Sequence, residues 1–240
     1  MEIQDSIQKS FLTSINYSII LNKFYYNMDH SNMTQPEFYD TECDYYLTYG
    51  ANPFFEPGGG SAGAINDIDT TFFNDPEVIH NDSDLEYGII KYSEGTLSER
   101  SFKHVKGVYH ILGNNWTYDN DDVAQAMSLP IVFQYYDVVI NHLLAQNNCP
   151  DKCKVLHLTK VPGDIYGGND TTYVGMLLAI NKNIEKCYEN NIILQLDISK
   201  KLFMDLMTNI QSHPYYYIFT TVVDNIEFPN IQKMIQLLEK

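Results

Sequence analysis

The stretch that decides the fold runs Asn52-Pro-Phe-Phe-Glu-Pro-Gly58-Gly59-Gly60-Ser61-Ala62-Gly63-Ala64-Ile65. It follows a tyrosine-rich segment over 45–49 that is typical of a buried strand, and small residues fill 58–64 without interruption. Glycine adopts a positive φ at no steric cost and lets the backbone approach a ligand closely. A strand, then glycines, then a helix start presents free N–H groups to a phosphate. The stretch therefore predicts an anion-binding loop after a buried strand.

Composition and charge narrow the class of partner. The chain has 240 residues, 44% of them hydrophobic, which is enough for one domain with a sizeable core. Its 31 acidic residues against 15 basic ones give a formal net charge of −16. This charge repels nucleic acid and anionic membranes at long range, so we expect neither as a partner. A phosphorylated ligand would have to be held by backbone dipoles and not by a basic patch.

The start of the chain shows no targeting segment. Met1-Glu-Ile-Gln-Asp is acidic and polar, unlike the positively charged start of a secretory signal. The most apolar early stretch, 18–21, is far shorter than the ~20 residues of a membrane span. We therefore expect a soluble, cytoplasmic protein.

The chain contains four cysteines, Cys43, Cys149, Cys153 and Cys187. The spacing of Cys149, Cys153 and His157 superficially resembles a zinc knuckle. A structural zinc site needs four ligands, usually in two paired clusters, and no second cluster follows in the sequence. Cytosolic cysteines are kept reduced. We therefore expect reduced structural thiols and no metal site.

Extended and helical segments alternate along the chain. Strands are expected over 17–26, 44–50, 105–112, 154–160, 191–197 and 215–223, and helices after Pro130 and over 171–189, 199–210 and 229–240. The polar, acidic segments 66–86 and 114–122 are interpreted as surface loops. Strands alternating with helices of this length predict an α/β fold with a largely parallel or mixed sheet. In such a fold the glycine loops lie at the carboxyl ends of strands, where ligands bind.

Two further blocks accompany the first glycine loop. Pro162-Gly163-Asp164-Ile165-Tyr166-Gly167-Gly168 also lies between a predicted strand and a predicted helix, so the two loops suggest opposing walls of one cleft. Tyr109-His110-Ile-Leu-Gly-Asn-Asn-Trp116 ends an extended segment and holds the single Trp of the chain. Alone, each glycine loop is an ordinary turn, and a lone histidine is more often a satisfied core residue than a catalyst. A P-loop is excluded because no Gly-Lys-Ser/Thr follows Gly60, and the spacing fits a dinucleotide fingerprint poorly.

In this order the blocks resemble the macrodomain family of ADP-ribose-binding proteins, also called Appr-1-p processing-like. That family shows an Asn-Ala-Ala-Asn strand end, Gly-Gly-Gly-Val-Asp-Gly-Ala-Ile-His, then Ile-His-Thr-Val-Gly-Pro-x-Trp, and later Ser-Thr-Gly-Ile-Tyr-Gly. Here Asn52 stands six residues before Gly58, as in the family, and the later blocks follow at family-like spacings. The resemblance covers about 45–168. It implies a three-layer α/β/α sandwich with a mixed central sheet, in a single domain over 1–240 with elaborations at 1–40 and 185–240.

The resemblance also implies a ligand site made by both glycine loops. Backbone N–H groups of the two loops would grip the phosphates of ADP-ribose, Asn52 would bond the distal ribose and be the candidate catalytic residue, and Tyr166 would pack against that sugar. The adenine would lie near Val223-Asp224-Asn225. The ligand-binding residues expected are Asn52, Gly58, Gly59, Gly60, Ser61, Ala62, Gly63, Ile65, Gly163, Asp164, Ile165, Tyr166 and Gly167. Neither a cofactor nor a metal ion is implied.

Departures from the family pattern bear on catalysis. Tyr49 occupies the place of the first Asn, Ala62 that of an Asp, and Asn66 that of a His. In hydrolysing members these polar residues help to position water near the distal ribose. Asp67 and Asp69 are read as solvated loop charges, with an unconventional acid as the alternative. Asp164 stands where the second loop has a glycine, or marks an insertion, and its carboxylate would repel a diphosphate unless it points away or the loop is remodelled.

Three functions remain open. The leading one is a monomeric module that binds ADP-ribose or an ADP-ribosylated protein. The second is a hydrolase that removes ADP-ribose from proteins or phosphate from ADP-ribose 1''-phosphate. The third is an interaction protein that keeps the fold with a degenerate pocket.

Overall fold

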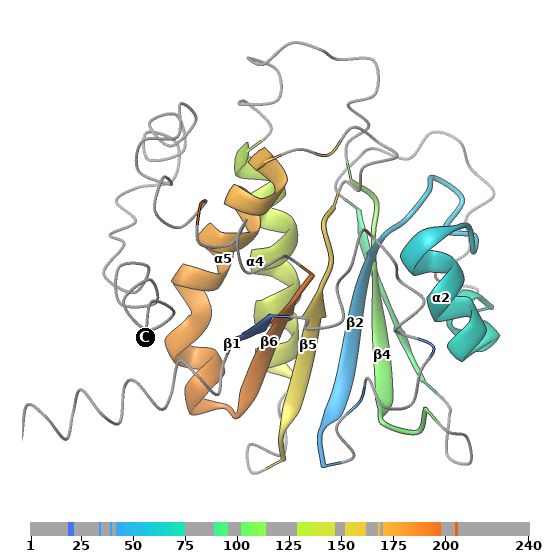
Figure 1. Ribbon diagram of the computed structural model, residues 1–240, viewed down its shortest axis with the longest axis horizontal. Coiled ribbons are helices and arrows are strands. Elements are labelled where there is room, and N and C mark those ends of the chain that lie inside the picture. The colour runs from blue at the N-terminus through green and yellow to red at the C-terminus, as the bar shows by residue number, and fades with distance from the viewer. Residues whose placement is uncertain are drawn as a thin grey trace, which may run out of the picture.

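Six strands form one mixed sheet in the order β1-β6-β5-β2-β4-β3 (Figure 1). The computed structural model describes residues 19–21, 34, 39, 42–74, 89–95, 102–113, 129–146, 152–161, 168, 170–197 and 205. The strands are β1 (Ile19–Leu21), β2 (Asp44–Gly50), β3 (Ile90–Glu94), β4 (Val105–Ile111), β5 (Lys154–Leu158) and β6 (Ile192–Leu196). All neighbours pair in parallel except β3, which runs antiparallel to β4.

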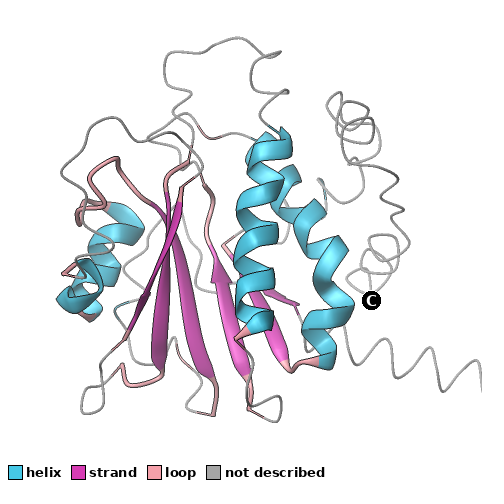
Figure 2. Ribbon diagram, turned by 180° about the vertical axis from the view of Figure 1, so that it is seen from behind, coloured by secondary structure: helices cyan, strands magenta, loops and turns pink. Residues whose placement is uncertain are grey.

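Helices cover both faces of the sheet. They are α2 (Gly60–Ile68), the short 3-10 helix η3 (Thr70–Phe73), α4 (Leu129–Ala145) and α5 (Asp170–Glu189). Figure 2 shows α4 and α5 side by side over one face, with α2 beyond the sheet. One apolar core joins α4 and α5 to β4, β5 and β6, and a second joins α2 and η3 to β2 and β4. The predicted three-layer sandwich with a mixed sheet is confirmed.

The central strands are buried on both faces because their side chains alternate between the two cores. On β2, Tyr45, Leu47 and Tyr49 face α2. On β5, Leu156 and Leu158 face α4 and α5. Such continuous apolar runs are what the sequence patterns of these strands predict.

The other sequence predictions agree only in part. The strands expected at 44–50, 105–112, 154–160 and 191–197 and the helices after Pro130 and over 171–189 are present, and three residues of the strand expected at 17–26 are β1. Residues 114–122, 199–210 apart from the helical Asp205, 215–223 and 229–240 lie outside the described residues. The edge strand β3 was not predicted, since only Ser93 of its side chains is buried.

The prediction of a surface loop over 66–86 is wrong at its start. Helix α2 continues to Ile68, and η3 follows it with Phe72 and Phe73 buried. Asp69 is buried and caps η3, because its Oδ1 accepts a 2.9 Å hydrogen bond from the Thr71 N–H. It is therefore no solvated loop charge, whereas Asp67 is exposed. The two aromatic side chains bury this segment despite its polar composition.

The prediction of reduced thiols is also wrong, because Cys43 and Cys153 form a disulfide. These cysteines directly precede Asp44 and Lys154, which are register partners in the parallel pair β2–β5. Two positions 110 residues apart in sequence are thereby brought to a Cα–Cα distance of 4.6 Å. Disulfides persist in oxidising environments and are rare in the cytosol, which weakens the expectation of a cytoplasmic protein.

The disulfide also removes Cys153 from any zinc knuckle, and His157 is hydrogen-bonded through Nε2 to Asp197 at 2.9 Å. Cys149 lies outside the described residues, and Cys187 is a buried free thiol whose pKa is raised to about 12 by burial. Within the described ranges, His, Cys, Asp and Glu side chains form no group of three that could hold a metal ion. The helices of that same part of the chain include none that is long and apolar enough to cross a bilayer.

Candidate functional site

The chain leaves the neighbouring strands β2 and β5 toward opposite faces of the sheet. After β2 it passes to α2, and after β5 it passes to α5 on the other face (Figure 1). In open α/β sheets, ligands bind outside the carboxyl ends of strands at such a switch point. Because both predicted glycine loops follow these two strands, the candidate site lies at this edge of the sheet.

The first glycine loop forms the start of α2. Gly59 is the N-cap residue, with φ −82° and ψ −178°, and as a glycine it has no side chain to cap the helix. The first turn contains no acidic residue, and Gly58, Gly59 and Gly60 are exposed. The first N–H groups of a helix have no acceptor within it, and the helix dipole makes this end positive. The start of α2 is thus an open position for an anion.

The space around the glycines differs from one to the next. A Cβ atom on Gly58 or Gly59 would meet nothing within 4 Å. A Cβ on Gly63 would lie 2.6 Å from the carbonyl oxygen of Gly58, so a glycine is needed where the helix touches its own loop. Gly60 has φ 62°, a conformation that other L-residues adopt only with strain.

The rest of the predicted first loop is divided between surface and core. Ser61 is half-buried, whereas Ala62 and Ile65 are buried and pack toward the sheet. The side chains of Ala62 and Ile65 therefore belong to the core and not to the exposed start of α2. Asn66 is half-buried farther along the helix.

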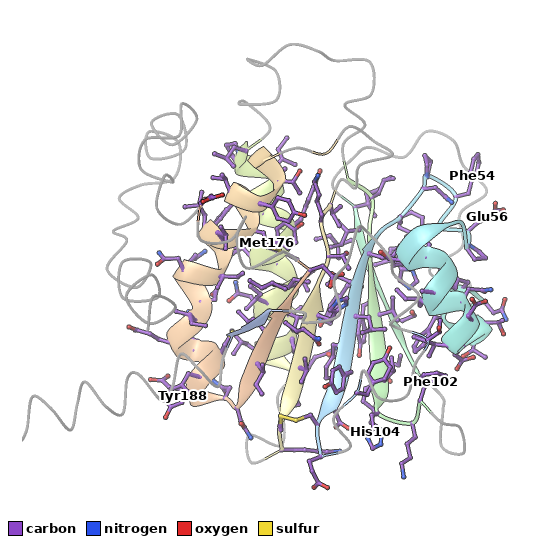
Figure 3. All side chains as sticks on the ribbon, in the orientation of Figure 1. Phe54, Glu56, Phe102, His104, Met176 and Tyr188 are labelled. Atoms are coloured by element: carbon purple, nitrogen blue, oxygen red, sulfur yellow. A yellow bond between two sulfur atoms is a disulfide. The ribbon has the colours of Figure 1, made fainter. Side chains whose placement is uncertain are left out.

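The side chain of Asn52 holds the loop that precedes the glycines. Its Oδ1 accepts hydrogen bonds from the N–H groups of Phe54 at 3.0 Å and Glu56 at 3.2 Å. Its Nδ2 donates to the Glu56 carbonyl at 3.0 Å. Figure 3 shows Phe54 and Glu56 on the loop above α2. Since an amide nitrogen has two protons, the second N–H of Asn52 has no acceptor among the described residues.

Phe55 anchors the same loop in the core. Its side chain is fully buried, its N–H donates to the Asn52 carbonyl at 2.9 Å, and Lys91 Nζ lies 4.9 Å from the ring centroid. Its φ of 54° is unusual for a bulky residue and costs on the order of 1–3 kcal/mol, which its surroundings must offset. The buried side chain and this hydrogen bond fix the loop to the body of the protein.

His110 lies in a buried network beneath this loop. Its Nδ1 is 2.7 Å from the Tyr49 hydroxyl, and its Nε2 is 2.7 Å from Ser93 Oγ. Burial, with the nearby charge of Lys91, lowers the pKa of His110 to about 3, so the ring is neutral. Burial raises the pKa of Tyr49, so its hydroxyl keeps its proton, and Tyr49 and Ser93 give each ring nitrogen of His110 a hydrogen-bonding partner. His110 is thus a satisfied core residue.

Acidification is expected to destabilise the protein through His110. Its pKa in the folded state, about 3, lies below the ordinary value of 6.5, so unfolding binds a proton between these pH values. Its contribution to stability is complete above about pH 6.5 and falls by up to about 1.4 kcal/mol per pH unit as the pH drops toward 3. The free energy of unfolding, measured by denaturant from about pH 7 to pH 4, should approach that of His110→Gln as the pH falls. Parallel pH profiles for the two proteins would contradict this assignment.

Several predicted site residues cannot be placed. They lie outside the described residues and are Gly163, Asp164, Ile165, Tyr166 and Gly167 of the second loop, Trp116, and Val223, Asp224 and Asn225. The residues that flank the second loop, Val161 and Gly168, are described. Conversely, the sequence interpretation missed Ser93 and Lys91, because nothing in the sequence marks β3 as a strand.

Comparison with solved structures shows the fold. The macro domain of ganglioside induced differentiation associated protein 2 matches with a TM-score of 0.54 at 11% identity, over 81% of this chain and 84% of that one. An Oceanobacillus iheyensis macrodomain mutant with ADPR matches with a TM-score of 0.49 at 13% identity, over 83% and 97% of the two chains. The O. iheyensis macrodomain with ADP has a TM-score of 0.45 at 13% identity, over 82% and 93%. No protein-family model and no curated protein matches the sequence. The first of these structures is enough to show that the chain has the macrodomain fold, as its three sequence blocks predict.

Proposed function

We propose that this protein, a chain with the macrodomain fold, binds ADP-ribose or an ADP-ribosyl group carried by a protein. The observation that carries the proposal is the start of α2, which has a glycine as its N-cap residue, no acidic residue in its first turn and exposed glycines before it. A charge-assisted hydrogen bond to a buried phosphate contributes about 1.5–3 kcal/mol. Several such bonds would offset the repulsion from a net charge of −16.

The proposed ligand spans the ends of β2 and β5. One phosphate would accept hydrogen bonds from N–H groups at the start of α2, and the second loop, Gly163 to Gly167, would hold the other. Asn52 would bond the distal ribose with its remaining N–H, and Tyr166 would pack against that sugar. Each of these roles follows from the family resemblance together with the switch point between the two strands.

Two side chains favour binding over hydrolysis. Tyr49, which stands in place of a polar Asn, turns into the core and bonds His110. Ala62, which stands in place of an Asp, is apolar and buried. Neither can position a water molecule near the distal ribose. The protein is therefore proposed as a binding module.

Calorimetry with ADP-ribose tests the proposal directly. We expect a saturable heat with one ligand per chain, and a rise in the unfolding midpoint with ligand concentration. Adenosine, which lacks the phosphates, is the matched ligand and should give neither. The absence of both heat and thermal shift at millimolar ADP-ribose would refute the proposal. Release of free ADP-ribose from a modified protein, lost in Asn52→Ala, would favour the hydrolase instead.

A further inference from the structure

The pairing between β2 and β5 stops before β2 ends. The register partners run from Asp44 and Lys154 to Leu47 and His157. On its other side, β2 continues to pair with β4 as far as Gly50 and Ile111. The two strands at the switch point therefore separate at Thr48, just before the candidate site.

Beyond the last register pair, two buried threonines link β2 to the chain after β5. The N–H of Thr159 donates to Thr48 Oγ1 at 2.9 Å, and Thr159 Oγ1 donates to the Thr48 carbonyl at 3.0 Å. Thr48 Oγ1 in turn donates to the His157 carbonyl at 2.9 Å. Each hydroxyl bonds a backbone group of the other strand in place of a backbone partner, so every one of these polar groups is paired where the ladder has ended.

Tyr136 on α4 directs the chain after β5 away from β2. Its hydroxyl donates to the Thr159 carbonyl at 2.9 Å and accepts from the Val161 N–H at 2.9 Å. The side chain is fully buried between α4 and the sheet. One hydroxyl thus fixes the backbone on both sides of Lys160, and it comes from the helix that lies on the opposite side of the sheet from α2 (Figure 2).

We propose that Thr48, Thr159 and Tyr136, here called the strand-end clamp, are positioning residues for the ligand site. The clamp sets the separation of the two strand ends from which both ligand loops start, and it touches no ligand itself. This inference rests on the proposed function. N–H donors on two loops can bind one ligand only if the loops are correctly spaced, and a displacement of about 0.5 Å is enough to lower the affinity. A buried polar network of this kind acts as a unit, so loss of one member loosens the rest.

Isosteric variants test the clamp. Tyr136→Phe and Thr159→Val each remove one hydroxyl and keep the volume of the side chain. The matched control is Tyr109→Phe, because Tyr109 faces the same core and bonds His142 Nδ1 at 3.0 Å, near the end of α4. In calorimetry, the clamp variants should bind ADP-ribose at least about fivefold more weakly, and the control within about twofold of wild type. Equal affinities in all four proteins, or equal weakening in the control, would overturn the proposal.

Coupling between the variants gives a second readout. Thr48→Val and Tyr136→Phe both act through Thr159, so the affinity lost in the double variant should be less than the sum of the two losses. A merely structural role would lower the unfolding midpoint in each protein and leave affinity at 25 °C unchanged. Additive losses of affinity would show that the three residues do not act as one clamp.

Amide hydrogen exchange decides the case without a ligand. In Tyr136→Phe the amides of Thr159 and Val161, and those of the non-proline residues over 51–60 that follow β2, should exchange faster, while Tyr109→Phe leaves them unchanged. If wild-type protein fails to bind ADP-ribose, the proposed function fails, and faster exchange over 51–60 still supports the clamp. Unchanged exchange over 51–60 would overturn the clamp whatever the protein binds.

Discussion

Gly59→Glu abolishes ADP-ribose binding and leaves the protein folded: this is the largest effect expected of a single substitution. The backbone of Gly59, with φ −82° and ψ −178°, suits any residue, and an added Cβ has open space around it. A carboxylate at the start of a helix is favourable to the dipole, so α2 should not be weakened. The same carboxylate would occupy the anion position. Loss of two charge-assisted bonds of about 1.5–3 kcal/mol each corresponds to at least about a hundredfold in affinity.

Two matched substitutions separate charge from volume at this position. Gly59→Ala should bind nearly as tightly as wild type, since its Cβ meets nothing. Gly59→Gln has the shape of the glutamate without its charge, so its affinity for ADP-ribose should lie between those of Gly59→Ala and Gly59→Glu. Calorimetry gives the affinities, and circular dichroism with thermal unfolding checks the fold. Wild-type affinity in Gly59→Glu would show that the phosphates lie elsewhere.

Loss of the Cys43–Cys153 disulfide is expected to have the largest effect on stability. The bond closes a loop across 110 positions. In the chain-entropy description, a crosslink over such a loop stabilises the folded state by about 3–5 kcal/mol, because it restricts the unfolded chain. Reductant, or the double substitution of Cys43→Ser and Cys153→Ser, should lower the free energy of unfolding by this amount. Denaturant titration with and without reductant measures the loss.

The remaining cysteine of the described part supplies the control. Cys187 is a free, buried thiol, so Cys187→Ala should stay as sensitive to reductant as wild type. The double serine variant should show no further response to reductant. Alkylation of the denatured protein, followed by peptide mass analysis, should label Cys43 and Cys153 only after reduction. Labelling of both before reduction would contradict the disulfide.

A structural element can be predicted from the sequence when the interactions that form it lie within a few residues of one another. The strand over 44–50 and the loop after it were predictable because a continuous apolar run and consecutive glycines act within a few residues. The edge strand β3 was not, since its side chains are mostly half-buried and carry no alternating pattern. The same holds for η3, whose burial depends on the sheet that it meets.

Parts of the site that depend on tertiary contacts could not be predicted. The hydrogen bonds between Thr48 and Thr159 join positions 111 residues apart, and nothing in either local sequence indicates them. The role of Asn52 is different, because family resemblance points to a ribose and the structure shows an amide that also builds its own loop. A sequence motif indicates which residues lie at a site, but it does not indicate which of their atoms already make hydrogen bonds within the protein.

The sheet consists of two half-sheets, β1-β6-β5 and β2-β4-β3, joined along a single seam of four register pairs. The seam is held at both ends. A disulfide joins the amino ends of β2 and β5 (Figure 3), and hydrogen bonds of the threonine hydroxyls join their carboxyl ends. Shear or rotation of one half against the other must therefore break one of these links. The two loops of the proposed site start from different halves, so the disulfide and the threonine hydrogen bonds together limit movement of one strand end against the other.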